Sequence, residues 1–213
     1  QLKLQESVSI LDFGASTAAT ATANTTAIQA AITAAGAYGQ VYIPSGTYDI
    51  NGTILIPNTS IGLHIKCDGK MNYTGTTVAW QIGESGGKLW ELNLNGLYVT
   101  RAYTTPFETG LLYTAFRFVS VGEGVFNDLR CQGFRKGYAL HSGDGSVSLN
   151  TFSSISSQDC FYNIYMNCEE FDYSYTTANA FLGGYHVTNQ ANFTDNVTSG
   201  AALIQIENTY RLT

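Results

Sequence analysis

The stretch Phe126-Asn-Asp-Leu-Arg-Cys131, followed by Gly137-Tyr-Ala-Leu140, sets a pattern that returns along this 213-residue chain. An aromatic residue comes first, a small apolar residue follows, and a short apolar run closes the unit. Two later units keep this order: Phe152, Ile155, Cys160 and Asn163-Ile-Tyr-Met166, then Phe181, Tyr185, Val187 and Leu203-Ile-Gln-Ile206. Each unit has roughly 25–30 residues, a period typical of solenoid repeats.

Short runs that alternate apolar with other residues, separated by Gly, Asn, Asp and Ser, predict strands elsewhere in the chain. These runs are Val8-Ser-Ile10, Val41-Tyr-Ile43, Thr47-Tyr-Asp-Ile50, Ile54-Leu-Ile56, Leu63-His-Ile65 and Ala115-Phe-Arg-Phe-Val119. One unit fits a rung of three short strands, with rungs about 4.8 Å apart. A β-sandwich does not predict the recurring aromatic and cysteine positions. The sequence therefore predicts an all-β fold, a right-handed parallel β-helix.

One segment has a helical period instead. Ala27, Ile28, Ala31 and Ile32 lie on one stripe, which predicts a helix over residues 24–35. Asn24 is expected to be its N-cap, and Gly36 stands where a left-handed C-cap is expected. The narrow stripe suits a helix that caps the end of a larger structure.

Three blocks within residues 8–50 resemble the opening of the pectate-lyase-like superfamily: Ser9-Ile-Leu-Asp-Phe-Gly-Ala15, Thr26-Ala-Ile-Gln-Ala-Ala-Ile32 and Gln40-Val-Tyr-Ile-Pro-Ser-Gly-Thr-Tyr48. The superfamily includes phage tailspikes, capsule depolymerases, polygalacturonases and fungal exo-glucanases. The resemblance implies a lead-in or stem end over residues 1–7, a strand and capping helix over 8–39, and β-helix rungs over 40–213 that continue beyond this chain. Thr17–Asn24 replaces the acidic run usual in the family, which weakens the capping.

The amino-acid composition argues against several classes of binding partner. Charged residues make up 12% of the chain, about half the usual fraction, and the net charge is −6. The absence of a basic run argues against nucleic-acid binding, and a polyanionic polymer would have to bind locally against the net field. No stretch is long and apolar enough for membrane insertion. The four cysteines fit no zinc spacing and are expected to be buried thiols, and neither a metal nor a cofactor is expected.

The densest acidic group supplies the catalytic candidates. Glu169, Glu170 and Asp172 stand together, and Asp159 precedes them. Glycoside hydrolysis needs two carboxyl groups that flank the bond, and neighbouring rungs can supply such pairs. A lyase needs a cation and a base, but the Lys and Arg residues form no obvious cluster in the sequence. The sequence favours hydrolysis over elimination, while a solvated turn remains the alternative role for these acids.

Tyrosines crowd the C-terminal half and are candidates for contact with sugar rings. Aromatic faces stack on sugars, and the phenol hydroxyl adds a hydrogen bond. The candidates are Tyr162, Tyr173, Tyr175 and Tyr185. The alternative is that most of them cover turns or pack between subunits.

A second, looser resemblance concerns function. Asn150-Thr-Phe152 and Asn179-Ala-Phe-Leu-Gly-Gly184 resemble rungs of phage tailspikes. This resemblance implies a homotrimer on the virion, outside the cell, that binds bacterial capsule or lipopolysaccharide and contacts other tail proteins through its N-terminus. Three functions stay open: a tailspike that depolymerises a polysaccharide, a non-catalytic adhesion or structural spike, and a cellular pectinase-like or glucanase-like enzyme.

Overall fold

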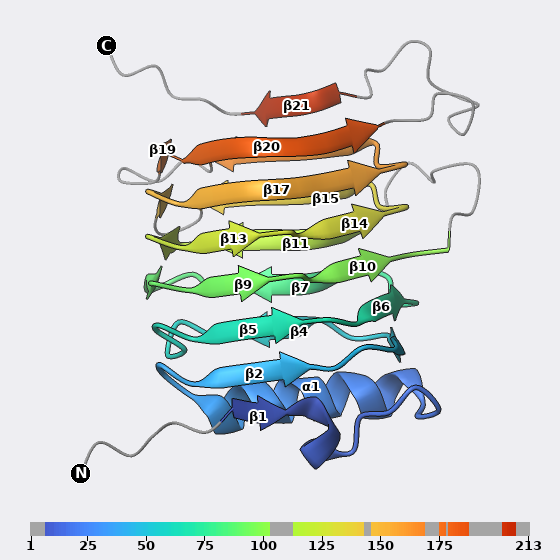
Figure 1. The fold of residues 1–213 in the computed structure, drawn as a ribbon. Coiled ribbons are helices and arrows are strands. Elements are labelled where there is room, and N and C mark those ends of the chain that lie inside the picture. Colours follow the sequence, from blue (N-terminus) through green and yellow to red (C-terminus); the bar gives the residue numbers. More distant parts are fainter. Residues whose placement is uncertain are drawn as a thin grey trace, which may run out of the picture.

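The structure is a computed structural model, and it describes residues 7–102, 113–142, 146–168, 175–177, 179–187 and 202–207. Its strands pair in parallel and stack into a β-solenoid above a single helix (Figure 1). The predicted parallel β-helix with one N-terminal helix is therefore confirmed. In the described part of the chain, no helix is long and apolar enough to cross a membrane.

The chain enters through β1 (Ser7–Ser9), a 3-10 helix, η1 (Ile10–Phe13), and α1 (Ala21–Ala35). The predicted N-cap is wrong, because the Thr20 side chain accepts a hydrogen bond from the Ala23 N–H and so caps the helix one turn earlier. Asn24 is instead buried. Its side chain accepts from the Ser16 N–H (2.9 Å) and donates to the Asp49 carbonyl (3.1 Å), which ties the helix to the first rung.

The C-terminal cap of α1 also differs from the prediction. Gly36 has φ 62° and ψ −156°, which is outside the left-handed helical region, although its N–H still bonds the Ile32 carbonyl. Only glycine adopts this conformation readily. The chain leaves the helix in an extended direction and enters the first long strand four residues later.

Three sheets form the sides of the solenoid. Sheet A has two columns, β1, β2 (Gln40–Ile43), β5 (His64–Cys67), β9 (Asn93–Asn95) and β13 (Val125–Asn127), and then β3 (Thr47–Ile50), β6 (Lys70–Tyr73), β10 (Tyr98–Thr100) and β14 (Arg130–Gln132). The long strands β17 (Thr151–Gln158) and β20 (Ala180–Val187) pair across both columns. Sheet B contains β4 (Ile54–Ile56), β7 (Val78–Ile82), β11 (Thr114–Val119), β15 (Lys136–Ser142), β18 (Tyr162–Cys168) and β21 (Ala202–Glu207). Sheet C contains β8 (Leu89–Trp90), β12 (Val121–Gly122), β16 (Ser146–Ser148) and β19 (Tyr175–Thr177).

The recurring phenylalanines of the sequence form one inward column. Phe126 pairs with Phe152, and Phe152 pairs with Phe181. Their ring centroids lie 4.9 and 4.8 Å apart, so each ring contacts the equivalent ring of the next rung, tilted in the first pair and stacked in the second. Burial of each such side chain contributes roughly 1.5–3 kcal/mol. This repeat is the sequence signal that fixes the register.

The cysteine recurrence has a different basis. Cys131 pairs in register with Ser157, and Cys160 follows at the next corner, so the two are not in one column. Their sulfur atoms nevertheless lie 3.9 Å apart in the core. Cys67, Cys131 and Cys160 are buried free thiols, as predicted, while the side chain of Cys168 lies outside the described residues.

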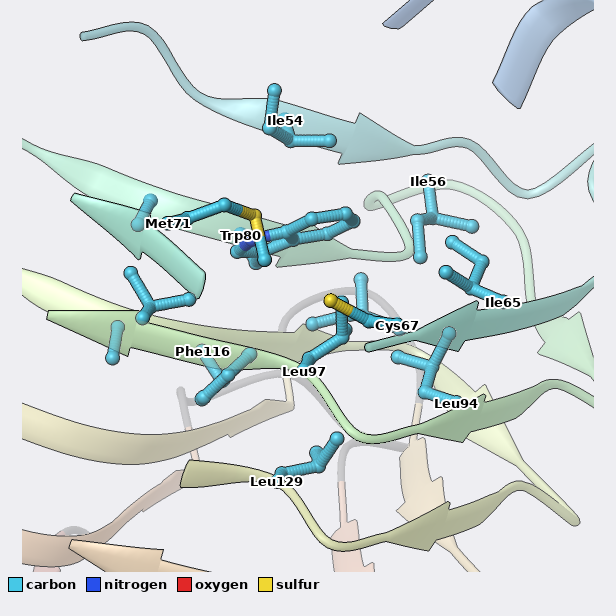
Figure 2. Packing of buried hydrophobic residues seen from close by; sticks show 14 of the residues in the cluster. Ile54, Ile56, Ile65, Cys67, Met71, Trp80, Leu94, Leu97, Phe116 and Leu129 are labelled. Atoms are coloured by element: carbon cyan, nitrogen blue, oxygen red, sulfur yellow. The ribbon is translucent and has the colours of Figure 1, made fainter. Parts of the chain in front are cut away.

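The lower core is filled by aliphatic side chains around one indole. Trp80 lies between Ile54 of β4 and Phe116 of the next rung, with Met71 beside it (Figure 2). These side chains are fully buried, as are the leucines that Figure 2 labels in the neighbouring rungs. The core therefore runs without interruption from the capping helix into the upper rungs.

A left-handed corner joins the two columns of sheet A in successive rungs. Gly96, Asp128, Ser154 and Gly183 occupy this corner with φ of 80°, 51°, 52° and 69°. Glycine is required at Gly96, because a Cβ atom there would lie 2.2 Å from the Cys67 carbonyl oxygen. Because of this corner, one continuous chain segment contributes a strand to each column of sheet A without an intervening loop.

Candidate functional site

The outer face of sheet B gathers cations and aromatic rings from successive rungs. We define the cation–aromatic patch by eight residues: Arg101, Tyr113, Arg117, Arg135, Lys136, Phe161, Tyr162 and Tyr165. Register explains the grouping, because the Lys136 N–H bonds the Tyr113 carbonyl and the Tyr162 N–H bonds the Arg135 carbonyl. Residues far apart in sequence thus stand one rung apart at the start of sheet B.

Direct contacts connect most of the patch. The Lys136 ammonium lies 3.4 Å from the centroid of the Tyr165 ring, and the Arg101 guanidinium lies 3.6 Å from that of Tyr113. The Arg135 guanidinium lies 5.6 Å from the centroid of the Phe161 ring. Such cation–π contacts contribute about 0.5–2 kcal/mol each, depending on burial. They hold long, flexible cationic side chains against rigid rings.

Tyr162 connects the two ends of the aromatic group. Its ring meets Phe161 edge-on at a centroid distance of 4.6 Å and lies 5.7 Å from Tyr165. In the central column of β11, β15 and β18, Arg117 pairs with Ala139 and Ala139 pairs with Tyr165. The small Ala139 side chain therefore separates a guanidinium from an aromatic ring on the same face.

The charge of this face differs from that of the whole chain. The six strands of sheet B contain two fixed cations, Arg117 and Lys136, together with His141 and one acid, Glu207. The two ion pairs between described residues, Lys66–Asp68 and Arg130–Asp128, both lie on sheet A. The cations of the patch are half-buried, while Phe161 and Tyr165 are buried beneath them. Charge interactions at half-buried groups are stronger than in bulk water.

The half-buried His141 stands near the end of β15, beyond Ala139. It pairs with Asn167 of β18, which in turn pairs with Glu207 at the end of β21. Imidazole and carboxylate groups are the usual proton donors and acceptors of active sites. His141 therefore borders the patch at the edge next to sheet C.

The predicted catalytic carboxylates are only partly covered by the structure. Asp159 is half-buried in a corner with φ 53°, and its carboxylate accepts a hydrogen bond of 3.2 Å from the Gln132 side chain. This corner leads directly to Phe161 in the patch. Glu169, Glu170 and Asp172 lie outside the described residues, so the predicted carboxylate pair stays a prediction.

Another acidic pair, on a different corner, was not found from the sequence. Glu91 and Glu123 are exposed and have φ of 58° and 55° at equivalent corners of neighbouring rungs. The Glu91 N–H bonds the Gly122 carbonyl, which aligns the two rungs. These acids lie between sheets C and A, away from the patch. Their spacing in sequence carries no signal, because their proximity depends on the register.

The predicted sugar-binding tyrosines do not share one face. Tyr162 begins β18 of sheet B, Tyr175 pairs with Ser146 in sheet C, and Tyr185 pairs with Ser156 in sheet A. Tyr173 lies outside the described residues. The structure therefore brings Tyr162 into the patch and assigns Tyr175 and Tyr185 to other sheets, and the roles of all four stay predictions.

Most members of the patch were not selected from the sequence. Arg101, Arg117 and Arg135 were seen as cations without a cluster, and Lys136 and Phe161 carried no signal of their own. The one sequence signal that could have grouped them is the number of residues between paired positions of two neighbouring rungs. Arg135 and Phe161 are separated by the same number of residues as Cys131 and Ser157, which pair in register. Such a signal becomes usable once the register is known. In the described part of the chain, no three His, Cys, Asp or Glu residues are placed to hold a metal ion.

Comparison with known proteins agrees with this architecture. Residues 7–87 match the family model described as rhamnogalacturonase A/epimerase, pectate lyase-like. The match lies in the N-terminal part of the chain and shows a similarity to the pectate lyase-like β-helix family. The resemblance inferred from the three sequence blocks is therefore confirmed. No curated protein matches the chain in sequence.

Solved structures of similar fold include a viral protein and polysaccharide-degrading enzymes. ORF18 of Geobacillus virus E2 superposes with a TM-score of 0.66 at 15% identity, covering 84% of this chain and 36% of that protein. An iota-carrageenase complexed to iota-carrageenan fragments superposes with a TM-score of 0.51 at 16% identity, covering 78% of this chain and 42% of the enzyme. This chain thus spans less than half the length of either protein. At these identities the likeness concerns the fold alone.

Proposed function

We propose that this chain is part of a phage tail protein that recognises a bacterial surface polysaccharide through the cation–aromatic patch. The observation that carries the proposal is the packing of Lys136 on Tyr165, with Tyr162 beside them, on the outer face of sheet B. Aromatic rings stack on the apolar faces of sugars, while neighbouring ammonium and guanidinium groups donate hydrogen bonds to hydroxyl or acidic groups. The fold shared with the viral ORF18 supports the phage origin.

The patch is suited to a polymer because it extends over several rungs. Arg101 and Tyr113 come from one rung, Arg135 and Lys136 from the next, and Phe161 with its neighbours from the rung after that. Rungs are about 4.8 Å apart, so the described patch extends over roughly 10 Å of the axis. A surface of this length contacts consecutive sugar units rather than a single one.

Depolymerisation is the second element of the proposal. β18 carries Tyr162 and Tyr165 and ends at Cys168, so Glu169, Glu170 and Asp172 follow directly from the patch strand, and Asp159 precedes it. We propose that two of these four carboxyl groups act as acid and as nucleophile or base in hydrolysis. A separation of about 5–5.5 Å would give retention and about 6.5–9.5 Å inversion.

A non-catalytic adhesion spike is the competing function. One observation favours it: the described patch contains four cations and no carboxylate, so it can bind without cleaving. In either case we propose a homotrimer on the virion, in contact with other tail proteins through its N-terminus. The exposed apolar side chains of Val125, Leu149 and Leu182 are consistent with burial between subunits. A cellular pectinase-like or glucanase-like enzyme is the third candidate, and nothing in the patch favours it.

The test uses purified protein and a panel of bacterial capsules and lipopolysaccharides. Binding, product size, new reducing ends and absorbance of unsaturated uronates are followed together. We expect at least one polymer to bind, and to lose affinity about tenfold when Tyr162→Ala and Lys136→Gln are combined. The matched control is Lys66→Gln with Tyr42→Ala, which removes an exposed cation–π pair from sheet A.

The outcomes separate the candidates. Reducing ends without unsaturated uronates support hydrolysis, and their loss in Glu169→Gln, Glu170→Gln, Asp172→Asn or Asp159→Asn would identify the acids. Binding with intact polymer supports the adhesion spike. Equal loss of affinity in the patch variant and in the sheet A control would contradict the patch as the recognition surface.

A further inference from the structure

We infer that Cys131 and Cys160 form a modification site, whose two thiols join under oxidising conditions in a disulfide bond that links neighbouring rungs. The oxidant is a small-molecule disulfide, such as glutathione disulfide. This inference goes beyond the proposed function, because it does not depend on which polymer the protein recognises or on whether that polymer is cleaved.

The first argument is the contact between the two sulfur atoms. They lie 3.9 Å apart in the core, and the side chains of Cys131 and Cys160 are 2% and 0% exposed. A disulfide has a sulfur–sulfur distance of about 2.05 Å, so the two atoms must approach by about 1.9 Å. The thiol hydrogen bonds given up are weak: Cys131 donates to the Ser156 carbonyl at 3.8 Å, and Cys160 donates to the Gln158 carbonyl at 3.5 Å.

The second argument is the place of each cysteine in the fold. Cys131 is the middle residue of β14 and pairs with Val99 on one side and Ser157 on the other. Cys160 lies in the corner between β17 and β18, outside the strand ladders. Corner residues adjust more easily than paired ones, so the corner can supply most of the approach. Cys67 lies two rungs below Cys131, roughly 10 Å along the axis, which is beyond the reach of a disulfide.

The reaction consists of two exchange steps that balance. A thiolate of one cysteine attacks glutathione disulfide, breaks its sulfur–sulfur bond, forms a mixed disulfide and releases one glutathione. The thiolate of the other cysteine then attacks the protein sulfur of the mixed disulfide and releases the second glutathione. The two cysteines together lose two electrons and two protons, and the two glutathione molecules gain them.

Burial governs the rate of this reaction. It raises the pKa of Cys131, which lowers the fraction of reactive thiolate. The oxidant also reaches the pair only when the corner opens locally. We therefore expect the folded protein to be oxidised over hours, and faster at higher pH.

The bond would connect the rungs that carry part of the cation–aromatic patch. It closes a loop from residue 131 to residue 160 that contains Arg135 and Lys136, and Phe161 follows the loop directly. Thiols are kept reduced in the cytosol, whereas disulfides persist outside the cell. The two rungs would therefore be fastened together in the compartment where we propose that the protein acts.

The test begins with the reduced wild-type protein, which is incubated in glutathione disulfide at about pH 8. Samples are then denatured and alkylated, and their mass gives the number of remaining thiols. The reduced chain has four thiols, and we expect two after oxidation. Chymotrypsin cleaves after Phe161, between Cys160 and Cys168, so peptide mapping identifies the thiol that is joined to Cys131.

Variants connect the bond to stability. Cys67→Ala combined with Cys168→Ala leaves the pair as the only thiols of the chain, and we expect both to be lost on oxidation. Oxidation should raise the midpoint of thermal unfolding by roughly 5–10 °C, because a cross-link across about 30 residues restricts the unfolded chain. Cys131→Ala is the matched control, and its midpoint should not change with the oxidant.

The outcomes are independent of polymer binding. The inference is overturned if the wild-type protein keeps four thiols after a day in the oxidant and again after refolding in a mixture of reduced and oxidised glutathione. A stable glutathione adduct in place of the cross-link, or a cross-link to Cys67 or Cys168, would overturn it as well. Thiol count and peptide map come from the wild-type protein, so they decide the question even if a variant does not fold.

Discussion

Sheets A and B are built by the same rungs around the same core, yet their outer faces have different chemistry. On sheet A, Lys66 and Arg130 approach aspartates at 3.6 and 3.3 Å, and the Tyr42 hydroxyl donates to Asp68 at 2.8 Å. On sheet B, Lys136 lies on an aromatic ring. Because alternate residues of a strand face opposite sides, the outer residues can change without altering the core.

Aromatic support alone does not distinguish the two faces. On sheet A, the Tyr98 ring lies 5.2 Å from the Lys70 ammonium and 5.1 Å from the Arg130 guanidinium. Sheet A adds an ion pair to this arrangement, because Asp128 pairs with Arg130. The comparison teaches that one shared core can support outer faces with different polar contacts.

The largest effect is expected when the shared core is broken. Phe126→Ala removes a fully buried ring from the aromatic column and should lower the free energy of unfolding by about 3–5 kcal/mol. Val125→Ala is the control, because its side chain is 44% exposed and should cost below about 1 kcal/mol. Urea unfolding measures both. If the two substitutions lowered the free energy of unfolding equally, the stability would not depend on the buried aromatic column that the two sheets share.

A change confined to the corner of sheet A should have the next largest effect. Gly96→Ala introduces a Cβ 2.2 Å from the Cys67 carbonyl oxygen at φ 80°, so we expect a loss of about 2–3 kcal/mol. Ser154 occupies the equivalent corner two rungs higher with a Cβ already present, and Ser154→Ala should cost below about 1 kcal/mol. Thermal unfolding compares the two. A small effect of Gly96→Ala on stability would mean that the backbone of the lower rungs shifts at this corner to accommodate the added Cβ.

Alkaline pH should weaken the protein from inside sheet A rather than through its outer charges. Burial raises the pKa of Cys67 from 9.0 to about 11. Between these values the folded protein keeps a proton that the unfolded chain releases, so stability falls as the pH rises through this interval and is unaffected below it. Burial also raises the pKa of Cys131 and Tyr138, which acts in the same direction.

The measurement is urea unfolding of wild type and Cys67→Ala at pH 8 and pH 10.5. We expect the wild type to lose about 1–2 kcal/mol more than the variant over this range, which corresponds to most of the Cys67 contribution. Parallel losses would show that Cys67 ionises without penalty and that the thiol is reached by solvent.

The smallest effect concerns the outer charges of sheet A. Asp68→Asn removes the acceptor that holds the Tyr42 hydroxyl and so should lower the pKa of Tyr42 toward its ordinary value, because the hydrogen bond to Asp68 is the largest cause of its increase. Ultraviolet titration of the tyrosines measures this change. Stability and polymer binding should stay unchanged, since exposed ion pairs contribute little. Loss of binding would place the recognition surface on sheet A.

Much of the fold could be predicted from the sequence because apolar alternation and the Phe repeat are local signals. Strands β3 and β4 have the predicted bounds, and β2, β5, β11, β15, β18 and β21 differ from the prediction by a few residues at most. Strands β6, β7, β9 and β10 were missed, because they are three to five residues long in polar surroundings and are defined by pairing. The helix start was missed because Asn24 faces the first rung, which composition alone does not reveal.

The candidate site was less predictable, for a physical reason. Tyr162 was found because tyrosines crowd that segment, but its neighbours Arg135 and Lys136 come from the preceding rung. Rungs differ in length, so no fixed spacing in the sequence brings these residues together. Chemistry on a solenoid surface depends on register, and register becomes known only once strands are paired.

Register has one more consequence, for the dimensions of the molecule. Phe126, Phe152 and Phe181 stack in one column although the segments between them differ in length. Each rung adds about 4.8 Å to the axis however many residues its corners contain. Added residues at a corner therefore increase the width of the solenoid and leave its length along the axis unchanged. Evolution can rebuild the loops around the patch without altering the distance between any two rungs.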